Sequence, residues 1–185
     1  FHCDLRGMGL KRKDDAVQAS RPARVDSPRL THVMNKTYDF LVLGGGSAGY
    51  AAARTAHDLA LSVAVIDGAR DLGGLCILRG CMPSKTLIES ANRFRSMRRA
   101  EEFGLRAGGL EIRTDEIIAR KSRLIGEFAD YRRGQLEDGR FDLIRGTAAF
   151  CGKDSVFVTP LEGGDPFEIA FRSCLIATGS VVTRL

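Results

Sequence analysis

The residues best suited to chemistry stand close together in one short segment. The stretch GGLCILRGCMPSK contains Cys76 and Cys81 with four residues between them, and Lys85 follows shortly after. The thiolate form of cysteine is a nucleophile and a metal ligand, and it exchanges with disulfides. This segment could therefore bind a metal, form a structural disulfide or carry out redox exchange.

Four interpretations of the cysteine pair compete. A zinc site needs further ligands, but His2, His32 and His57 are scattered, so no metal site is expected. A structural disulfide is typical of secreted proteins, and no secretory signal is visible. Two unrelated core thiols are the third interpretation. The fourth is a redox dithiol at the start of a helix, where the helix end, Arg79 and Lys85 would lower a thiol pKa.

A glycine-rich turn precedes the cysteines. Residues 44–49, GGGSAG, fit G-x-G-x-x-G between an apolar run at 40–43 and an Ala-rich stretch from about 47 to 60. A second apolar run at 61–67 ends in Asp67. The order of strand, turn, helix and strand predicts a parallel βαβ unit that binds a dinucleotide.

The residues of this turn have expected tasks. Gly44 permits the tight turn, Gly46 lets a pyrophosphate approach the backbone, and Gly49 lets helix and strand pack closely. The helix N-terminus offers free N–H groups to the phosphates, and Asp67 is expected to accept hydrogen bonds from the adenosine ribose. The motif alone does not distinguish FAD from NAD. The cofactor-binding residues expected here are Gly44, Gly46, Ser47, Ala48, Gly49 and Asp67.

Helices and then strands are expected after the cysteines. Apolar residues recur at helical spacing in 83–102 and again in 113–138, where Thr114 or Asp115 is a candidate N-cap. Beyond them come five short strand-like runs: FDLIRG, TAAFCG, SVFVT, FEIAF and SCLIATG. The sequence predicts an α/β fold in which a parallel sheet is continued by an antiparallel β-meander over about 147–171.

Composition and charge exclude several classes of protein. The chain has 185 residues, 44% hydrophobic and 28% charged, which is ordinary for a globular domain, and no apolar run is long enough to span a membrane. Most of the net charge of +5 lies in residues 1–33, so no nucleic-acid partner is expected. We expect 1–33 to be a disordered or artefactual basic extension, and 34–185 to be the folded part of a cytoplasmic protein.

The cysteine segment resembles that of the class I pyridine nucleotide–disulfide oxidoreductases, whose pattern is G-G-T-C-x-x-x-G-C-x-P-S-K. Leu75 stands where Thr is usual, and that Thr lies near the flavin in the family. The resemblance runs from about Met34 to the end, because the glycine turn, the acid, the cysteines and the late ATG occur in the family's order. The matching residues of the cysteine segment are Gly73, Gly74, Cys76, Gly80, Cys81, Pro83, Ser84 and Lys85.

The resemblance implies an incomplete, Rossmann-like FAD-binding domain, of which 34–185 is the first segment. It implies FAD at the glycine turn and NAD(P)H in a later domain that is absent here. Cys81 would lie against the flavin and form the charge-transfer thiolate, and Cys76 would attack the dithiol or disulfide substrate. Asp67 stands where Glu is usual. Further cofactor contacts are implied for Gly74, Lys85, Ala148, Thr178 and Gly179.

The function expected from the resemblance is FAD-dependent disulfide oxidoreduction, and dihydrolipoyl dehydrogenase is favoured over glutathione or mercuric reductase. The parent is expected to be a homodimer, and this chain alone is not expected to turn over. The alternatives are a non-catalytic flavin- or dinucleotide-binding module, and a nicotinamide-dependent dehydrogenase that leaves the cysteines unexplained. We expect Cys76 and Cys81 near the helix start within disulfide range, with Cys81 deeper and nearer the cleft that Gly44–Gly49 border.

Overall fold

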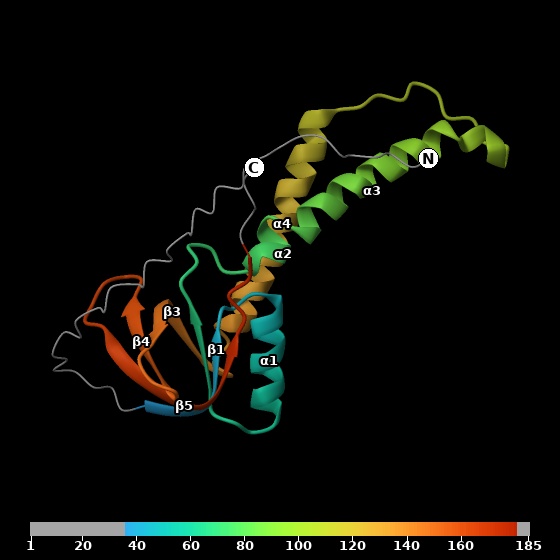
Figure 1. Cartoon of the computed structure of the whole chain (residues 1–185). Coiled ribbons are helices and arrows are strands. Elements are labelled where there is room, and N and C mark those ends of the chain that lie inside the picture. The colour runs from blue at the N-terminus through green and yellow to red at the C-terminus, as the bar shows by residue number, and fades with distance from the viewer. Residues whose placement is uncertain (1–35, 181–185) are drawn as a thin grey trace, which may run out of the picture. The chain divides into compact units, whose positions relative to one another are not determined.

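A computed structural model describes residues 36–180, and the expected extension at 1–33 lies outside the described residues. Strands and helices alternate at first, and strands follow one another at the end (Figure 1). The elements are β1 (Lys36–Leu43), α1 (Ser47–Asp58), β2 (Val63–Asp67), α2 (Gly74–Leu78), α3 (Cys81–Arg98), the 3-10 helix η1 (Ala100–Phe103), α4 (Thr114–Leu136), β3 (Asp142–Phe150), β4 (Ser155–Pro160) and β5 (Phe167–Ile176).

Strands β5, β1, β2 and β3 lie side by side in that order and pair in parallel. β1 pairs with β2 on one edge and with β5 on the other, so that Leu41 lies beside both Ala64 and Cys174. β2 in turn pairs with the first half of β3. The connection from β1 to β2 passes through α1, as the glycine motif and its flanking runs predicted.

Strand β4 closes the sheet into a five-stranded barrel. It pairs antiparallel with the second half of β3, where Ala148 faces Val158, and with the first half of β5, where Val156 faces Ile169. The expected antiparallel meander is therefore present. The expected parallel pairing is present as well, but an open Rossmann-like sheet is not, because the strands form one closed ring.

The closure depends on two strands that are longer than the runs that predicted them. β3 combines FDLIRG with TAAF, and β5 combines FEIAF with SCLI, so five expected short strands become three. Gly146 lies where β3 leaves β2 and meets β4, and a Cβ at this position would lie 2.6 Å from the carbonyl oxygen of Thr159. A glycine therefore lets β3 and β4 approach closely at this point.

Two groups of buried side chains form the core. One lies among the strands and includes Leu41, Ile66 and Val156. The other packs the remaining strand faces against α1 and the end of α4, and it includes Val65 and Leu136. Every residue of β2 is buried, because both faces of this central strand are covered.

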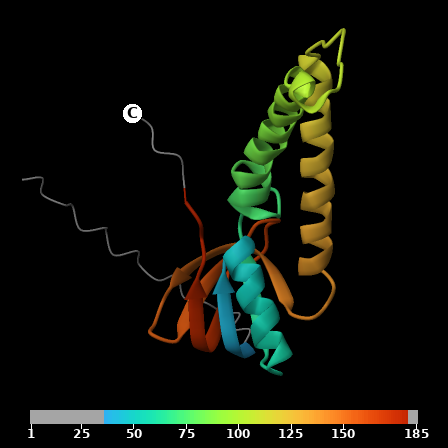
Figure 2. The same ribbon diagram turned by 90° about the vertical axis from the view of Figure 1, so that its right-hand side faces the viewer.

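Helices α3 and α4 pack against each other as a hairpin that extends away from the barrel (Figure 2). The helix expected over 83–102 ends at Arg98 and is followed by η1. α4 begins at Thr114, with Arg113 at the N-cap position and no side-chain cap, so the expected N-cap is wrong. Instead, the side chain of Arg113 forms an ion pair of 2.8 Å with Glu116. Among the described residues, no helix is long and apolar enough to cross a membrane.

Candidate functional site

The glycine-rich turn joins β1 to α1 at the C-terminal ends of the parallel strands. α1 begins at Ser47, and Gly46 at its N-cap accepts a hydrogen bond of 2.9 Å from the backbone N–H of Tyr50. Ser47 and Ala48 are exposed in the first turn of the helix. The N–H groups of a first helical turn have no partner within the helix, so this end can receive an anion.

Close backbone packing accounts for two of the three motif glycines. Gly44 has a φ of +103°, and a Cβ there would lie 2.4 Å from the carbonyl oxygen of Ala177. A Cβ on Gly49 would lie 1.8 Å from the carbonyl oxygen of Gly44. At Gly46 the nearest atom to such a Cβ is the Cα of Gly74, at 3.7 Å. A Cβ at Gly46 would therefore not overlap protein atoms, in contrast to Gly44 and Gly49.

Asp67, at the end of β2, accepts a backbone hydrogen bond at each of its two carboxylate oxygens. Its side chain is buried, Oδ2 accepts a hydrogen bond of 2.7 Å from the N–H of Gly45, and Oδ1 accepts one of 2.8 Å from Ala69. The guanidinium of Arg145 lies 3.7 Å from Oδ1. The carboxylate therefore holds the glycine turn in place, in addition to bordering the site expected for a ribose.

A cavity of about 650 Å³ lies at this end of the barrel. It is bordered by segments that are distant in the sequence: the glycine turn, the end of β2, the start of α2, the middle of β3 and the end of β5. The sequence-predicted residues that line it are Gly44, Gly46, Asp67, Gly74, Ala148, Thr178 and Gly179. Ser47, Ala48 and Gly49 belong to the adjoining turn of α1, whereas Cys76, Cys81 and Lys85 do not line this cavity.

Several lining residues were not predicted. Arg70 and Asp71 follow the acid of β2, Arg79 separates the two cysteines, and Thr147 lies beside Ala148 on β3. Their positions next to recognised motif residues were the available signal in the sequence. The pattern of the family leaves the residue type at 79 open, so the resemblance assigns this arginine no role in binding.

The two cysteines lie on different helices. Cys76 is the third residue of α2, and Cys81 is the first residue of α3. The expectation that one helix carries both cysteines is therefore wrong. Gly80 separates the two helices, and a Cβ on it would lie 3.3 Å from the Cα of Cys76, so the chain turns tightly here. Both thiols are free; Cys76 is half-buried and Cys81 is exposed, which contradicts the expectation that Cys81 lies deeper.

The pKa of Cys76 is raised, not lowered as expected. The neighbouring Cys81 is the largest cause, burial adds to it, and the positive charge of Lys85 acts in the opposite direction. Hydrogen bonding with the Cys81 side chain favours the protonated form of Cys76, and a thiolate at Cys81 would further oppose a second thiolate beside it. The effect of Cys81 on the pKa of Cys76 is thus larger than the opposite effect of Lys85.

A cation from α4 lies near enough to Cys76 for the two groups to interact electrostatically. The guanidinium of Arg132 stacks over the ring of Tyr50 at 4.0 Å, and α2, which carries Cys76, packs against α4. Burial lowers the pKa of Arg132, and a negative charge on Cys76 would raise it. This arginine is a feature of the dithiol surroundings that no sequence motif indicated.

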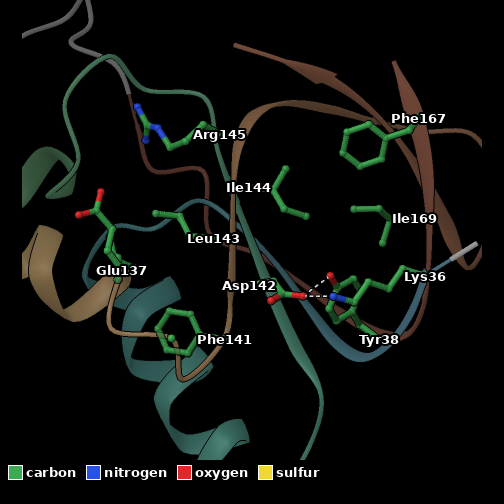
Figure 3. Close-up of a pocket in the computed structure, with 12 residues that line it drawn as sticks. Lys36, Tyr38, Glu137, Phe141, Asp142, Leu143, Ile144, Arg145, Phe167 and Ile169 are labelled. Atoms are coloured by element: carbon green, nitrogen blue, oxygen red, sulfur yellow. Dashed lines mark hydrogen bonds and ion pairs between the residues drawn. The ribbon is translucent and has the colours of Figure 1, made fainter. Parts of the chain in front are cut away.

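A second cavity, of about 580 Å³, lies near the N-terminal ends of β1 and β3. Figure 3 shows Lys36 and Tyr38 pointing toward Asp142 across it. The hydroxyl of Tyr38 donates a hydrogen bond of 2.6 Å to Asp142, and Lys36 forms an ion pair with the same oxygen. None of the residues expected to bind a cofactor lines this cavity, so the cavity at the glycine turn is the candidate functional site.

Comparison with known proteins identifies the class. The family described as pyridine nucleotide-disulphide oxidoreductase matches residues 38–185, which is most of the chain. The chain therefore belongs to this family of oxidoreductases, as the cysteine segment and glycine turn together implied.

Similar proteins of known name are oxidoreductases of the same class. The chain is 33% identical to a dihydrolipoyl dehydrogenase of Chlamydia muridarum over 147 residues, covering 80% of this chain and 31% of that protein. It is also 33% identical to one of Bacillus subtilis over 156 residues, covering 80% and 32%. The chain thus spans about a third of the length of these curated relatives.

A solved structure is also similar. It is a Cu(II) complex of the HOCl-induced flavoprotein disulfide reductase RclA from Escherichia coli, with a TM-score of 0.63 and 29% sequence identity. The match covers 81% of this chain and 30% of that one. The fold of the described residues is therefore similar to part of a flavoprotein disulfide reductase.

Proposed function

We propose that this chain is the first segment of the FAD-binding domain of a disulfide oxidoreductase, with Cys76 and Cys81 as its redox dithiol. One observation carries the proposal: a single cavity is bordered by the glycine turn, the acid of β2 and the start of the helix that holds Cys76. Membership of the oxidoreductase family supports the same function.

The residues around the cavity suit a dinucleotide. The phosphates would meet the N–H groups at the start of α1, beside Gly46, where no protein atom fills the space of a side chain. The adenosine would lie between Asp67 and Ala148, which border the cavity on β2 and β3. When bound, FAD would accept a hydride from NAD(P)H and pass two electrons to a disulfide.

The dithiol would exchange with a disulfide substrate in two balanced steps. The thiolate of Cys76 attacks one substrate sulfur, forming a mixed disulfide and releasing one substrate thiolate. The thiolate of Cys81 then attacks the sulfur of Cys76, which forms the Cys76–Cys81 disulfide and releases the second thiolate. The two thiols lose two protons, the substrate sulfurs take up two, and the reverse sequence oxidises a dithiol.

The substrate class we propose is a dihydrolipoyl group, because the chain is similar to dihydrolipoyl dehydrogenases of Chlamydia muridarum and Bacillus subtilis. Glutathione and mercuric ion are the competing substrates within the family. The proposal also includes NAD(P)H bound by a domain outside this chain, Lys85 near the flavin, and a homodimeric parent enzyme acting in the cytoplasm. Assay of the full-length protein with each substrate would separate these possibilities.

The roles of the cysteines are tested by single replacements in the full-length protein. Cys76→Ser should retain a long-wavelength absorption band from a thiolate beside the flavin while losing disulfide turnover. Cys81→Ser should lose both the band and the turnover. Cys151→Ser is the matched control, because this exposed thiol lies after β3 and does not line the cavity. If the band were instead lost in Cys76→Ser and retained in Cys81→Ser, Cys76 would be the thiol beside the flavin and Cys81 the one that attacks the substrate.

The same experiment separates catalysis from simple binding. A non-catalytic flavin-binding module would retain its visible flavin absorption, and it would show no disulfide turnover even before either cysteine is replaced. A nicotinamide-dependent dehydrogenase without flavin would show no such absorption. Unchanged turnover in both cysteine variants would remove the redox role of the segment.

A further inference from the structure

Arg79, which separates the two cysteines, faces the cavity at the glycine turn. It follows the last residue of α2, and its backbone N–H donates a hydrogen bond of 2.9 Å to the carbonyl of Leu75. Residues four positions apart on a helix lie on the same face. Leu75 and Arg79 accordingly both line the cavity, together with Leu78.

Helix α2 begins directly against the glycine turn. A Cβ on Gly74 would lie 2.6 Å from the Cα of Gly46 and 3.6 Å from the backbone nitrogen of Ser47. The wall formed by α2 therefore stands beside the first turn of α1. A phosphate group held by the N–H groups of α1 would lie next to this wall.

Arg79, the residue that follows α2, is the charged group on this wall of the cavity. The two side chains that α2 places there, Leu75 and Leu78, cannot donate a hydrogen bond. Across the cavity, the oxygens of Asp67 accept hydrogen bonds from the backbone N–H groups of Gly45 and Ala69. Within residues 36–180, no carboxylate pairs with Arg79, so its charge is available to an anionic ligand.

We propose that Arg79 binds the pyrophosphate of the dinucleotide from the α2 wall, beside the N–H groups of α1. This inference rests on the proposed FAD-binding function and adds a specific ligand residue to it. A guanidinium presents paired N–H donors that match two phosphate oxygens, and it remains charged at any ordinary pH. It would supply the donor that the apolar Leu75 cannot provide at this wall.

The test measures binding, not activity, with the full 185-residue chain. FAD, riboflavin and ADP are titrated against wild type, Arg79→Gln and Arg79→Lys, using flavin fluorescence and calorimetry. Arg79→Gln should weaken binding of FAD and ADP about tenfold, and Arg79→Lys less, because one charge-assisted contact is lost or reduced. Riboflavin has no phosphate, so its affinity should not change.

A matched control is Arg98→Gln, which removes an exposed arginine at the end of α3, away from the cavity. It should leave FAD affinity unchanged. A second measurement needs no variant: phenylglyoxal should modify Arg79 in the wild-type chain, and FAD or ADP should protect it while riboflavin does not. This keeps the inference testable if Arg79→Gln does not fold.

The outcomes separate the inference from the function on which it rests. Equal FAD affinity in wild type and Arg79→Gln, with no protection from phenylglyoxal, would overturn the role of Arg79 and leave the FAD site intact. An equal loss of riboflavin and FAD affinity would assign Arg79 to the flavin ring and overturn the pyrophosphate contact. If the 185-residue chain binds no FAD, the same titrations are made with the full-length protein, and a full-length protein that binds no FAD would remove the proposed function, and the inference with it.

Discussion

The carboxylate of Asp67 accepts a hydrogen bond of 2.7 Å from the backbone N–H of Gly45, inside the glycine-rich turn. The other carboxylate oxygen accepts one from the N–H of Ala69, so one buried side chain connects the turn after β1 with the loop after β2. Both loops border the candidate cofactor cavity. The acid at the end of the second strand thus shapes the site before any ribose is bound.

Replacing Asp67 by Asn should destabilise the domain. The amide retains one acceptor oxygen but presents an NH₂ group to the second backbone N–H, leaving a buried donor without a partner. The cost should be about 1–3 kcal/mol, measured as the free energy of unfolding in urea. Asp71→Asn, at an exposed position in the same loop, should change stability by less than about 0.5 kcal/mol. Equal effects of the two replacements would show that the Asp67 contacts contribute little.

Replacing Gly49 by Ala should be among the most damaging single changes. The added methyl would overlap the carbonyl oxygen of Gly44, 1.8 Å away, and backbone atoms cannot move aside as a flexible side chain can. We expect a loss of about 3 kcal/mol or more in the free energy of unfolding.

The control for Gly49 is a glycine in an open helical position. Gly126 lies within α4, and nothing lies within 4 Å of a Cβ placed there. Gly126→Ala should stabilise the protein by about 0.5–1 kcal/mol, because alanine has the higher helix propensity. A Gly49→Ala protein as stable as the wild type would contradict the packing described between α1 and β1.

Removing the Cys81 thiol should lower the pKa of Cys76. Cys81 is the largest cause of the raised pKa, so Cys81→Ser should shift the pH profile of Cys76 alkylation toward lower pH. Lys85→Met should shift it toward higher pH, because Lys85 lowers this pKa. Iodoacetamide labelling with peptide mapping gives the rates, and Cys151→Ser serves as the control. A shift to higher pH in Cys81→Ser would contradict the coupling.

The ion pair at the other end of the strands predicts a pH dependence of stability. The pKa of Asp142 is lowered by Lys36 first and by Tyr38 second. A lowered folded-state pKa means that the contribution is present above the unfolded pKa of about 3.9 and is lost as pH falls through the folded value. Both charged side chains are about half exposed, so solvent screening limits the contribution to about 1 kcal/mol or less.

Asp142→Asn should therefore be less stable than wild type near neutral pH and equally stable in strong acid, in urea unfolding followed by circular dichroism. Tyr38→Phe removes one of the two contacts and should show the same trend with a smaller amplitude. A stability difference that persists unchanged in strong acid would show that the effect of Asp142→Asn is not due to its charge.

The glycine turn is the part of the site that the sequence predicted best. The turn conformation of Gly44 and the close packing of Gly49 follow from steric rules that act over a few residues, and the structure has a positive φ at Gly44 and no room for a Cβ at Gly49. The flanking order of strand, helix and strand could also be predicted from the sequence, because each element has its own pattern of apolar residues. Of the later residues that line the cavity, Ala148, Thr178 and Gly179 were predicted, and only through the resemblance to a family.

The surroundings of the cysteines were predicted less well. Sequence reasoning assumed one helix and a lowered thiol pKa, whereas the structure has two helices and a raised pKa for Cys76. The chain turn at Gly80 brings two thiols together, and their mutual effect depends on a distance in space that spacing along the sequence does not specify.

By itself, the sequence determined the local features on which the proposed function rests: a glycine turn, an acid at the end of the next strand, and two cysteines followed by a lysine. These features depend on residue type and local geometry. Only the tertiary structure decided that β4 closes the strands into a barrel and that α2 begins against Gly46, which brings Arg79 to the cavity wall. Such contacts join residues far apart in the chain, and they depend on packing between elements that no local pattern encodes.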